Sequence, residues 1–391
     1  MSTVDPTLQS LDESVSLLRS TGIGSIRSFA WRDLDDPEAG GSEVHANEIF
    51  TRWVHAGLDV HLRTSALSGG SIEPRAYRSE QRGGRYSVFA SVIGHELTHR
   101  SPPGSAVVEI WNGVPWFSSL WRRAPGVTWL HHVHRHMWDD ALPRPLNVAG
   151  RYLETRLAPR FYRGSPVVTL SQSSRLEIEQ IGIPAASLTV IPPGIHQRFS
   201  PDETMRSTFP SAIVVGRLAP VKRTLETLRA LESAHDRHPS FIVNVVGDGP
   251  LRADIQRWIA DRNADWVHLH GRIDDDHLVR LYRQSWLVVS GSQAEGWGMS
   301  LTEAAACATP SVATDIAGHR DAMTNGLTGI LVPTVTDIGN GVGDLLDDTD
   351  RRMAMQIAAL QFSRQYSWDA VAARQLAVVA LEAKRRSSPK S

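Results

Sequence analysis

The stretch 286–315, WLVVSGSQAEGWGMSLTEAAACATPSVATD, decides the fold class of this chain. It begins with a short apolar run, 286–291, that is rich in β-branched residues. An alanine-rich, helix-forming run follows from Met299, and a second short apolar run occupies 310–315. Short buried strands that alternate with helices are typical of a parallel sheet covered on both faces.

The rest of the chain continues this alternation in both directions. In the second half the expected strands lie at 212–217, 241–247, 266–271, 286–291, 310–315 and 329–333. In the first half they lie at 25–31, 59–65, 85–91, 107–113, 127–132 and 166–171. We therefore predict an α/β protein with two doubly wound domains, divided near the Pro- and Ser-rich loop 192–211. Ligands of such sheets bind beyond the carboxyl ends of the strands, so the expected site is a cleft between the domains.

The composition is that of a globular protein. The chain has 391 residues, of which 41% are hydrophobic and 21% charged, and its formal net charge is -1. This length predicts two or three domains, and the near-neutral charge argues against a nucleic-acid partner. Cys307 is the only cysteine, so neither a disulfide framework nor a cysteine-based zinc site is expected.

The sequence contains no recognisable targeting or membrane-spanning segment. The first twenty residues carry acids where a secretory signal would carry bases and an apolar core. No run of eighteen apolar residues occurs in the chain. We expect a cytoplasmic protein, and peripheral attachment at the inner face of a membrane stays open.

The segment GRLAPVK, 216–222, directly follows an expected strand and opens a helix. Gly216 permits close backbone approach, and Arg217 and Lys222 place two cations at the strand end. A diphosphate fits such a position, because arginine offers a fork of donors, lysine a point charge and the helix its free N–H groups. The alternative interpretation is a solvated turn with two surface bases.

The segment EGWGMSLTE, 295–303, places two carboxylates around a strand-to-helix corner. Glu295 lies in the loop, Gly296 and Gly298 let the backbone bend, and Glu303 lies in the first turns of the helix. Carboxylates accept paired hydrogen bonds from vicinal hydroxyls, which suits a sugar or a ribose. The alternatives are a solvated loop acid, a helix-start acid, and a hydrolytic pair of carboxylates.

Two glycine-containing loops give weaker signals. GDGP, 247–250, is a tight turn after a strand, and turn chemistry alone explains it as well as a nucleotide contact does. In AGGSE, 39–43, Gly40 and Gly41 precede an amphipathic helix whose free N–H groups would receive a phosphate or an acceptor hydroxyl. An ordinary strand–loop–helix connection is the alternative there.

The segment HHVHRHMW, 131–138, contains four histidines. His132, His134 and His136 would share one face of an extended strand, which suggests a metal site. No cysteine or suitably spaced carboxylate completes a familiar ligand set. We therefore expect no metal, and one histidine at the strand end facing the cleft.

Taken together, VGRLAPVK, GDGP, HGRI, EGWGMSLTEAAACATPSVAT and AGGSE resemble the motifs of a family 4 retaining glycosyltransferase of GT-B fold. The resemblance runs from about residue 26 to 368, and the combined set is specific although no single segment is. It implies two Rossmann-like domains facing each other across a cleft. The expected bounds are 1–205 for an acceptor-binding domain, 206–368 for a nucleotide-sugar domain, and 369–391 for a C-terminal helix and tail that pack back on the first domain.

The resemblance implies donor-binding roles for several residues. It assigns the donor diphosphate to Arg217 and Lys222, beside Gly216. It assigns the ribose hydroxyls to Glu303, the second acid of the E-x7-E motif. It assigns the backbone N–H groups of Gly298 and Met299 to the sugar or the phosphate. It assigns the backbone groups of Arg272 and Ile273 to the base.

The resemblance also implies catalytic positions. Glu295, the first acid of the motif, matches the one near the donor sugar ring. His131 matches the histidine near the 6-position of the sugar, and His132 is the alternative one residue on. Gly40 and Gly41 match the loop over the reaction centre.

The implied activity is transfer of a hexosyl group from a nucleotide diphosphate sugar, GDP-mannose or a UDP-sugar, to an acceptor hydroxyl. It proceeds with retention and without a metal or cofactor, and the acceptor is a sugar, a lipid-linked or a small molecule. A nucleotide-sugar epimerase or a phosphorylase of the same fold is the alternative. Ala308 stands where the family usually has glycine, which we interpret as a difference in packing.

One further segment, 144–164, is strongly basic. It contains five arginines but only one acid, Glu154, and Leu, Tyr and Phe residues stand between them in the sequence. A surface helix that touches anionic lipid is one interpretation. A solvated basic helix is the other, and the sequence alone favours it.

Overall fold

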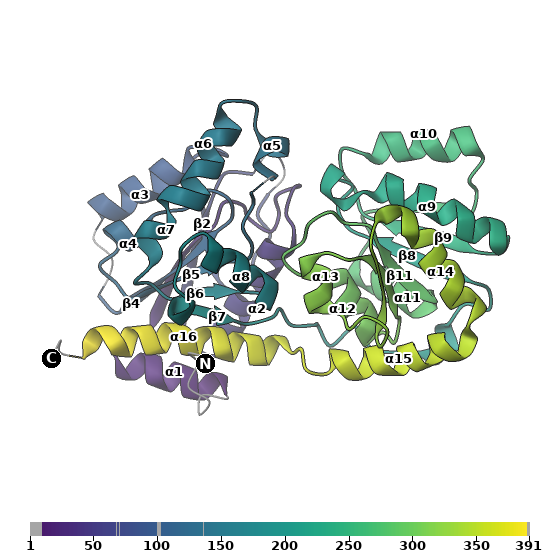
Figure 1. Cartoon of the computed structure of the whole chain (residues 1–391). Coiled ribbons are helices and arrows are strands. Elements are labelled where there is room, and N and C mark those ends of the chain that lie inside the picture. The colour runs from purple at the N-terminus through teal and green to yellow at the C-terminus, as the bar shows by residue number, and fades with distance from the viewer. Residues whose placement is uncertain (1–9, 68, 70, 100–102, 136, 389–391) are drawn as a thin grey trace. The chain divides into compact units, whose positions relative to one another are not determined.

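The computed structural model describes residues 10–67, 69, 71–99, 103–135 and 137–388 (Figure 1). The chain divides into two compact units. The first contains the chain up to Gly194 together with the C-terminal segment from Trp368, and the second contains 195–367. Each unit is built around one parallel sheet, which confirms the predicted two-domain α/β architecture.

The first unit has a seven-stranded parallel sheet in the order β3-β2-β1-β4-β5-β6-β7. Its strands are β1 Ser25–Phe29, β2 Asp59–Thr64, β3 Arg78–Gln81, β4 Ser105–Trp111, β5 Gly126–Leu130, β6 Val167–Thr169 and β7 Leu188–Val190. Its helices are α1 Leu11–Ser20, α2 Gly41–His55, α3 Val88–Thr98, α4 Ser118–Trp121, α5 Met137–Ala141, α6 Leu146–Tyr152, α7 Pro159–Tyr162, α8 Gln172–Gln180 and α16 Trp368–Ser387. The strand order reverses between the neighbouring strands β1 and β4, so a ligand site is expected beyond the carboxyl ends of these two strands.

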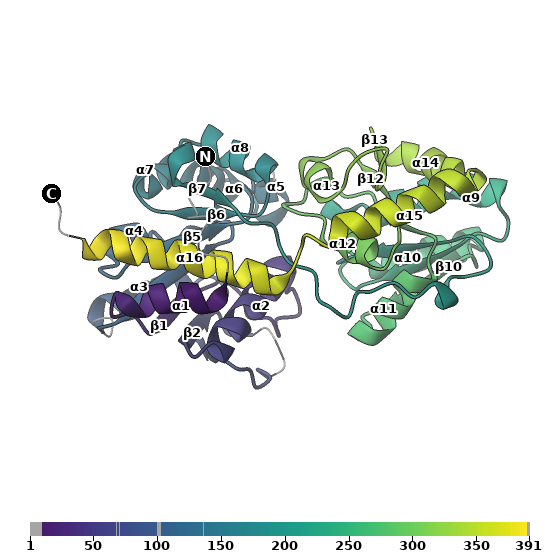
Figure 2. The same cartoon turned by 90° about the horizontal axis from the view of Figure 1, so that it is seen from below.

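The C-terminal helix α16 belongs to the first unit, as predicted. It lies beside α1 and across α2 and β5 (Figure 2). Trp53 donates its indole N–H to the carbonyl of Ala372 at 2.9 Å, and Ser14 donates its hydroxyl to the carbonyl of Ala373 at 3.2 Å. These buried hydrogen bonds fix α16 against α1 and α2, although most of the first unit and the whole second unit lie between them in sequence.

The second unit has a six-stranded parallel sheet in the order β10-β9-β8-β11-β12-β13. Its strands are β8 Ser211–Val215, β9 Ile242–Val246, β10 Val267–Gly271, β11 Leu287–Ser290, β12 Ser311–Thr314 and β13 Gly329–Val332. Its helices are α9 Thr224–Arg237, α10 Arg252–Arg262, α11 Asp275–Gln284, α12 Met299–Ala306, α13 Ala317–Ala322, α14 Ile338–Asp347 and α15 Thr349–Ser363. Each of the six strands predicted for this half is confirmed, because buried parallel strands form short apolar runs that the sequence makes visible.

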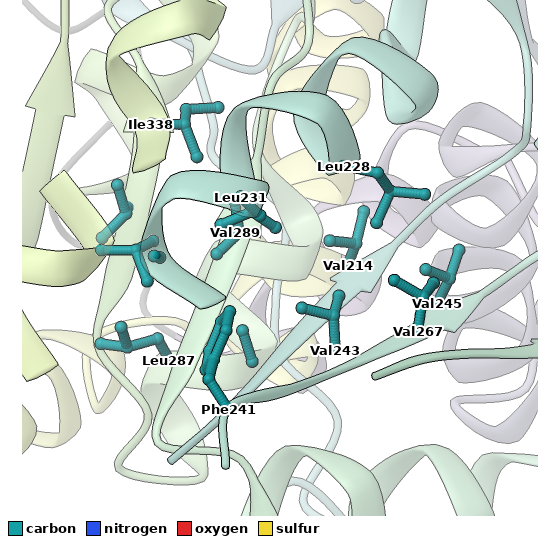
Figure 3. Close-up of a cluster of buried hydrophobic side chains, with 14 of the residues drawn as sticks. Val214, Leu228, Leu231, Phe241, Val243, Val245, Val267, Leu287, Val289 and Ile338 are labelled. Atoms are coloured by element: carbon teal, nitrogen blue, oxygen red, sulfur yellow. The ribbon is translucent and has the colours of Figure 1, made fainter. Parts of the chain in front are cut away.

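One face of this second sheet packs against α9 and α14 (Figure 3). Val214, Val243 and Val289 come from three neighbouring strands, and Leu231 of α9 and Ile338 of α14 lie over them. All five side chains are at most 7% exposed. This core holds β8 and β11 side by side, which positions the loops that follow them.

The boundary between the units lies at Gly194–Ile195 rather than at 205–206. Ile195 forms a parallel bridge with Ser367, and Phe199 packs edge-on against Tyr282 with ring centroids 5.8 Å apart. Arg283 also donates to the hydroxyl of Ser200 at 2.8 Å. Residues 195–205 therefore pack with the second unit, even though their composition is that of a linker.

One predicted strand of the first half, 85–91, was wrong. Helix α3 starts at Val88, and Val88 and Val92 are buried on one helical face. The hydroxyl of Ser87 accepts a hydrogen bond from the N–H of Gly84, which forms a turn directly before the helix. The strand of this region is β3, Arg78–Gln81, a polar edge strand without an apolar pattern. The buried strand β7 was also not predicted.

Candidate functional site

Two of the sequence motifs meet where the strand order of the second sheet reverses. β8 and β11 are neighbours, although β9 and β10 lie between them in sequence. GRLAPVK follows β8, and EGWGMSLTE follows β11. The backbone N–H of Gln293 donates to the carbonyl of Val221 at 2.8 Å, so the two loops are in direct contact. A reversal of strand order is where doubly wound sheets bind ligands.

An ion pair joins the two motifs at this point. The ammonium of Lys222 lies 2.9 Å from the carboxylate of Glu295, whose side chain is 10% exposed. Ser292 donates its hydroxyl to the same carboxylate oxygen at 2.6 Å. Burial alone would raise the pKa of Glu295, but Lys222, His319 and the Ser292 hydroxyl outweigh it and hold the pKa well below its usual range. Glu295 is therefore a carboxylate at physiological pH, not the solvated loop acid of the alternative interpretation.

His319 is a member of this cluster that the sequence analysis missed. It is fully buried in α13, and its Nε2 lies 3.5 Å from Glu295 and 3.1 Å from the hydroxyl of Ser290. Its Nδ1 lies 2.7 Å from the carbonyl of Thr314 and can only donate to that oxygen. Gly318 brings α13 this close, because a Cβ there would lie 2.3 Å from the carbonyl oxygen of Glu295. His319 thus lies directly behind the Glu295 carboxylate and contributes to the low pKa of that group.

The GDGP turn supports the first motif through its backbone. The N–H of Gly216 donates to the carbonyl of Val246 at 3.0 Å. Gly247 has a φ of +136°, and a Cβ at this position would lie 1.9 Å from the carbonyl oxygen of Gly216. Gly247 is therefore required by the close approach of two loops, which agrees with the turn-chemistry interpretation. Arg217 is exposed at this edge of the sheet.

Glu303 lies on α12, which begins at Met299 with Gly298 as its N-cap residue. The half-buried carboxylate accepts a hydrogen bond from the hydroxyl of Tyr282 at 3.1 Å. Burial raises the pKa of Glu303 to about 7, and the Tyr282 hydroxyl only partly offsets this. Glu303 therefore has a different partner and a different ionisation behaviour from Glu295, which distinguishes the two acids chemically.

The expected base-binding positions follow β10. Gly271 ends this strand, Arg272 is exposed, and Ile273 is partly buried in the cluster that also contains Tyr282. Asp274 then caps α11 by accepting a hydrogen bond from His277 N–H at 2.7 Å. The acids that follow Ile273 thus start a helix. Ile273 packs against the apolar cluster that contains Tyr282, the hydrogen-bond partner of Glu303.

In the first unit, Gly40 and Gly41 lie at the other reversal of strand order. Gly40 is the N-cap residue of α2, and its N–H donates to the carboxylate of Glu43 at 2.8 Å. The amide of Asn112, directly after β4, donates to the hydroxyl of Ser42 at 3.3 Å. The loop thus lies beyond the carboxyl ends of β1 and β4.

His131 comes directly after β5 and is 8% exposed. Its ring contacts His45 of α2 edge-on with centroids 4.8 Å apart, and His45 in turn contacts Trp129 and Trp368. Burial, with the nearby histidines, holds the pKa of His131 well below its ordinary value, so the ring is neutral. Its Nε2 has no hydrogen-bond partner among the described residues. A neutral imidazole with an unused nitrogen can accept from or donate to a hydroxyl.

The remaining histidine segment forms a loop and not the expected strand continuation. Glu154, the single acid of the basic segment, is fully buried and accepts from the backbone N–H groups of His134 and Arg135 at 3.0 and 3.2 Å. It also accepts from the indole of Trp138 at 2.9 Å. This role of Glu154 was not predicted from the sequence, and His136 lies outside the described residues. Within the part of the chain that is described, no group of three or more potential ligands is arranged to hold a metal.

Two family models match the chain in succession. The model for "Glycosyltransferase Family 4" matches residues 39–198, and the model for "Glycosyl transferases group 1" matches 197–362. Among the described residues no helix is long and apolar enough to cross a membrane.

Several known proteins are similar to this chain. A GDP-mannose-dependent alpha-(1-6)-phosphatidylinositol monomannoside mannosyltransferase of Mycobacterium tuberculosis is 29% identical, but the match covers only 54% of this chain and 60% of that protein. A D-inositol 3-phosphate glycosyltransferase of Thermobispora bispora is 27% identical over 90% of this chain and 93% of that protein.

Solved structures are similar in fold. Sucrose-phosphate synthase from Thermosynechococcus elongatus aligns with a TM-score of 0.73 and 19% identity, over 89% of this chain and 96% of that chain. HepE of Anabaena, solved in complex with UDP and glucose, aligns with a TM-score of 0.71 and 18% identity, over 90% and 97% of the two chains. At these identities the likeness concerns the fold alone.

Proposed function

The chain belongs to the family 4 glycosyltransferases of GT-B fold, and on this premise we propose that it transfers a hexosyl group from a nucleotide diphosphate sugar to an acceptor hydroxyl. In the proposed reaction the configuration at the anomeric carbon is retained. No metal ion and no cofactor takes part.

The observation that carries this proposal is the ion pair between Lys222 and Glu295 at the reversal of strand order. A nucleotide sugar has an anionic diphosphate joined directly to a ring of hydroxyls. A cation beside a carboxylate matches this pair of groups, because the cation attracts the diphosphate and the carboxylate accepts from a sugar hydroxyl. A pair of hydrolytic carboxylates would leave Lys222 and Arg217 without a role.

We assign the stabilisation of the leaving diphosphate to Arg217, Lys222 and the N–H groups of Gly298 and Met299. Negative charge develops on the diphosphate as the glycosidic bond breaks, and preorganised donors lower the free energy of that state. The acceptor hydroxyl attacks the anomeric carbon on the face that the diphosphate leaves. The acceptor proton passes to a diphosphate oxygen, so the products are a glycoside and a nucleoside diphosphate.

The other expected residues hold the donor. Glu295 accepts from a hydroxyl of the sugar ring, with His319 and Ser292 fixing its orientation. Glu303 accepts from the ribose hydroxyls, and backbone groups of Arg272 and Ile273 meet the base. The neutral ring of His131 accepts from or donates to the 6-hydroxyl of the sugar, and Gly40 and Gly41 lie over the reaction centre.

The names of the relatives guide the choice of substrates. GDP-mannose is the first candidate donor, since the mycobacterial relative is GDP-mannose-dependent, and a UDP-sugar is the second. The relatives' names also suggest an inositol phosphate or a phosphoinositide glycolipid as the acceptor. A lipid-linked acceptor would require peripheral contact with the cytoplasmic face of a membrane.

The test is a transfer assay with GDP-mannose, UDP-glucose and UDP-N-acetylglucosamine, each with and without inositol phosphate or phosphatidylinositol. Nucleoside diphosphate release that depends on the acceptor, together with a glycoside of unchanged anomeric configuration in proton NMR, is the expected result. The E295Q variant should lose this activity while it still binds nucleotide.

The same assay separates the alternatives. An epimerase would change the sugar without an acceptor, and a phosphorylase would accept a sugar phosphate in place of the nucleotide sugar. Either result would replace the proposed reaction. An E295Q variant with full transfer activity would contradict the role of Glu295.

A further inference from the structure

We propose that His45 of α2 is a positioning residue for His131, whose ring it orients through a buried water that both rings bind. The inference deepens the proposed function, and it rests on that function for the sugar hydroxyl that His131 meets. The contact between the two histidines lies wholly inside the first unit and does not depend on the proposed reaction.

Aromatic rings enclose the side chain of His45. It lies in the second turn of α2 and is 1% exposed. Its ring meets His131 edge-on, with centroids 4.8 Å apart and an angle of 77° between the two planes. Trp129 and Trp368 contact the same ring, with centroids 5.1 and 5.7 Å away. Because packed side chains hold defined rotamers, these contacts fix the edge that His45 presents to His131.

The same cluster contains four polar atoms that form no hydrogen bond within the described part of the chain. They are both ring nitrogens of His45, Nε2 of His131 and the indole nitrogen of Trp129. Buried polar atoms in folded proteins almost always have a partner, and an ordered water supplies it where no protein group does. A buried water forms about three hydrogen bonds, and these three residues in contact can supply them.

Both imidazole rings in this cluster are neutral. Burial lowers the pKa of His45 to about 3. Burial also holds the pKa of His131 well below its ordinary value, and the nearby His45 is the next largest cause. A neutral imidazole has one donor and one acceptor nitrogen, and the hydrogen bond at one of them decides which carries the proton. A hydrogen bond from the shared water to Nε2 of His131 therefore selects one tautomer and leaves Nδ1 for a sugar hydroxyl.

The alternative is that His45 only fills space in the core. An apolar side chain would do so without unpaired polar atoms, and the next three buried positions of α2, Ala46, Ile49 and Phe50, are apolar. A metal ion between the two histidines is a second alternative, but no third potential ligand is arranged beside them in the residues that the structure describes. A polar ring at this one position, next to His131, therefore favours a hydrogen-bonding role.

The first test is NMR of the full chain labelled with nitrogen-15 in its histidines, because long-range proton–nitrogen correlations distinguish the two tautomers of an imidazole. The H131F variant identifies the signals of His131 by their loss. His131 should give a single tautomer in the wild type. In H45F, where phenylalanine fills the same space without a nitrogen, it should give a mixture of both. A mixture in the wild type, or an unchanged single tautomer in H45F, would overturn the inference.

Transfer assays of the same variants test whether His45 acts through His131. H45F should transfer the sugar about 10- to 100-fold more slowly than the wild type, because a small misplacement of a group at the reacting centre lowers the rate. Its affinity for the free nucleoside diphosphate should not change. H45F/H131F should be no slower than H131F, because a residue that acts only through a missing side chain has no further effect. Losses of rate that multiply would contradict the proposed positioning.

Two further variants separate this role from packing. H45Q offers an amide donor and acceptor at the same position, so it should restore most of the rate and a single tautomer of His131. F50L is the matched packing control, because Phe50 stacks on Trp129 with centroids 5.4 Å apart but has no polar side-chain atom. F50L should lower the thermal midpoint yet keep the rate and the tautomer of the wild type. If F50L loses both as H45F does, packing alone holds His131 and the inference is wrong.

The two kinds of measurement also separate this inference from the proposed function. A wild-type chain that transfers no sugar, but whose His131 tautomer changes in H45F, would refute the proposed function and leave the link between the two histidines intact. A chain that transfers sugar equally fast in the wild type and in H45F would overturn the role of His45 and leave the proposed function intact.

Discussion

Raising the pH from 6 to 8 is expected to tighten nucleotide-sugar binding about tenfold through the carboxyl of Glu303. This carboxyl is half-buried on α12 and accepts a hydrogen bond from Tyr282 at 3.1 Å. In the proposed function it accepts from the two ribose hydroxyls. Hydroxyl donors bind the ionised carboxylate in preference to the protonated acid, so binding favours loss of the proton.

The magnitude follows from the position of the pKa. Burial raises the pKa of Glu303 from 4.5 to about 7. The ionised fraction of the free protein then grows from about 0.1 at pH 6 to about 0.9 at pH 8. If only the ionised form binds the ribose, the affinity grows by the same factor.

The raised pKa of Glu303 also makes the stability of the folded protein fall as the pH rises. The unfolded chain ionises this carboxyl near its ordinary pKa, whereas the folded protein holds the proton up to about pH 7. Stability contributed by the protonated acid is therefore fully present below pH 4.5 and is lost as the pH rises through 7. The full shift corresponds to at most about 3 kcal/mol, and solvent screening of a half-buried group reduces it to about 1–2 kcal/mol.

The assay is isothermal titration calorimetry with GDP-mannose and with UDP-glucose at pH 6, 7 and 8. Diphosphate diesters of this kind carry no group that titrates in this range, so a change reports on the protein. The E303Q variant should bind the nucleotide sugar weakly, with an affinity that does not change between pH 6 and 8. Its free energy of unfolding should exceed that of the wild type at pH 8 but not at pH 4.5. A flat wild-type profile, or the same slope in E303Q, would refute the role of Glu303.

Three further outcomes are expected. Glu295→Gln releases Lys222 from its ion pair, so calorimetry should record about 3- to 10-fold tighter binding of a nucleoside diphosphate, and weaker binding would contradict the pairing. Gly247→Ala places a Cβ 1.9 Å from a carbonyl oxygen and should cost at least about 2 kcal/mol in urea unfolding, whereas Gly24→Ala, with open space around it, should cost less than about 1 kcal/mol. Ala308→Gly should stabilise the protein by about 0.5–1 kcal/mol and so raise its thermal midpoint, because Ala308 has a φ of +57° at a helix end. An unchanged or lower midpoint would count against backbone strain at Ala308.

The sequence predicted the second unit better than the first for a physical reason. Its strands are buried on both faces and therefore form short apolar runs. The edge strand β3 has the polar sequence RSEQ, which carries no such pattern. The run 85–91 has β-branched and aromatic residues but folds into the start of α3, because a turn at Gly84 and burial of Val88 and Val92 outweigh strand propensity.

The residues of the candidate site were predicted more readily than their partners. Lys222 and Glu295 follow strands whose C-terminal ends, Val215 and Ser290, are 75 residues apart in sequence and that only the sheet order brings together. His319 and Tyr282 belong to no motif, and their roles arise only from tertiary contacts with the two acids. In the sequence Glu154 is only the single acid of a basic segment, whereas in the structure it is buried and accepts three hydrogen bonds from the loop after β5 and from Trp138.

Calorimetric titration of a nucleoside diphosphate into the R217Q/K222Q variant tests the central claim most directly. Loss of two charge-assisted contacts, each about 1.5–3 kcal/mol, should weaken binding at least about 100-fold relative to the wild type. The control R229Q/R280Q, which removes two exposed arginines of the same unit, should bind like the wild type. If R217Q/K222Q binds the diphosphate as tightly as this control, the diphosphate is not held at the carboxyl ends of β8 and β11, and the proposed donor site is wrong.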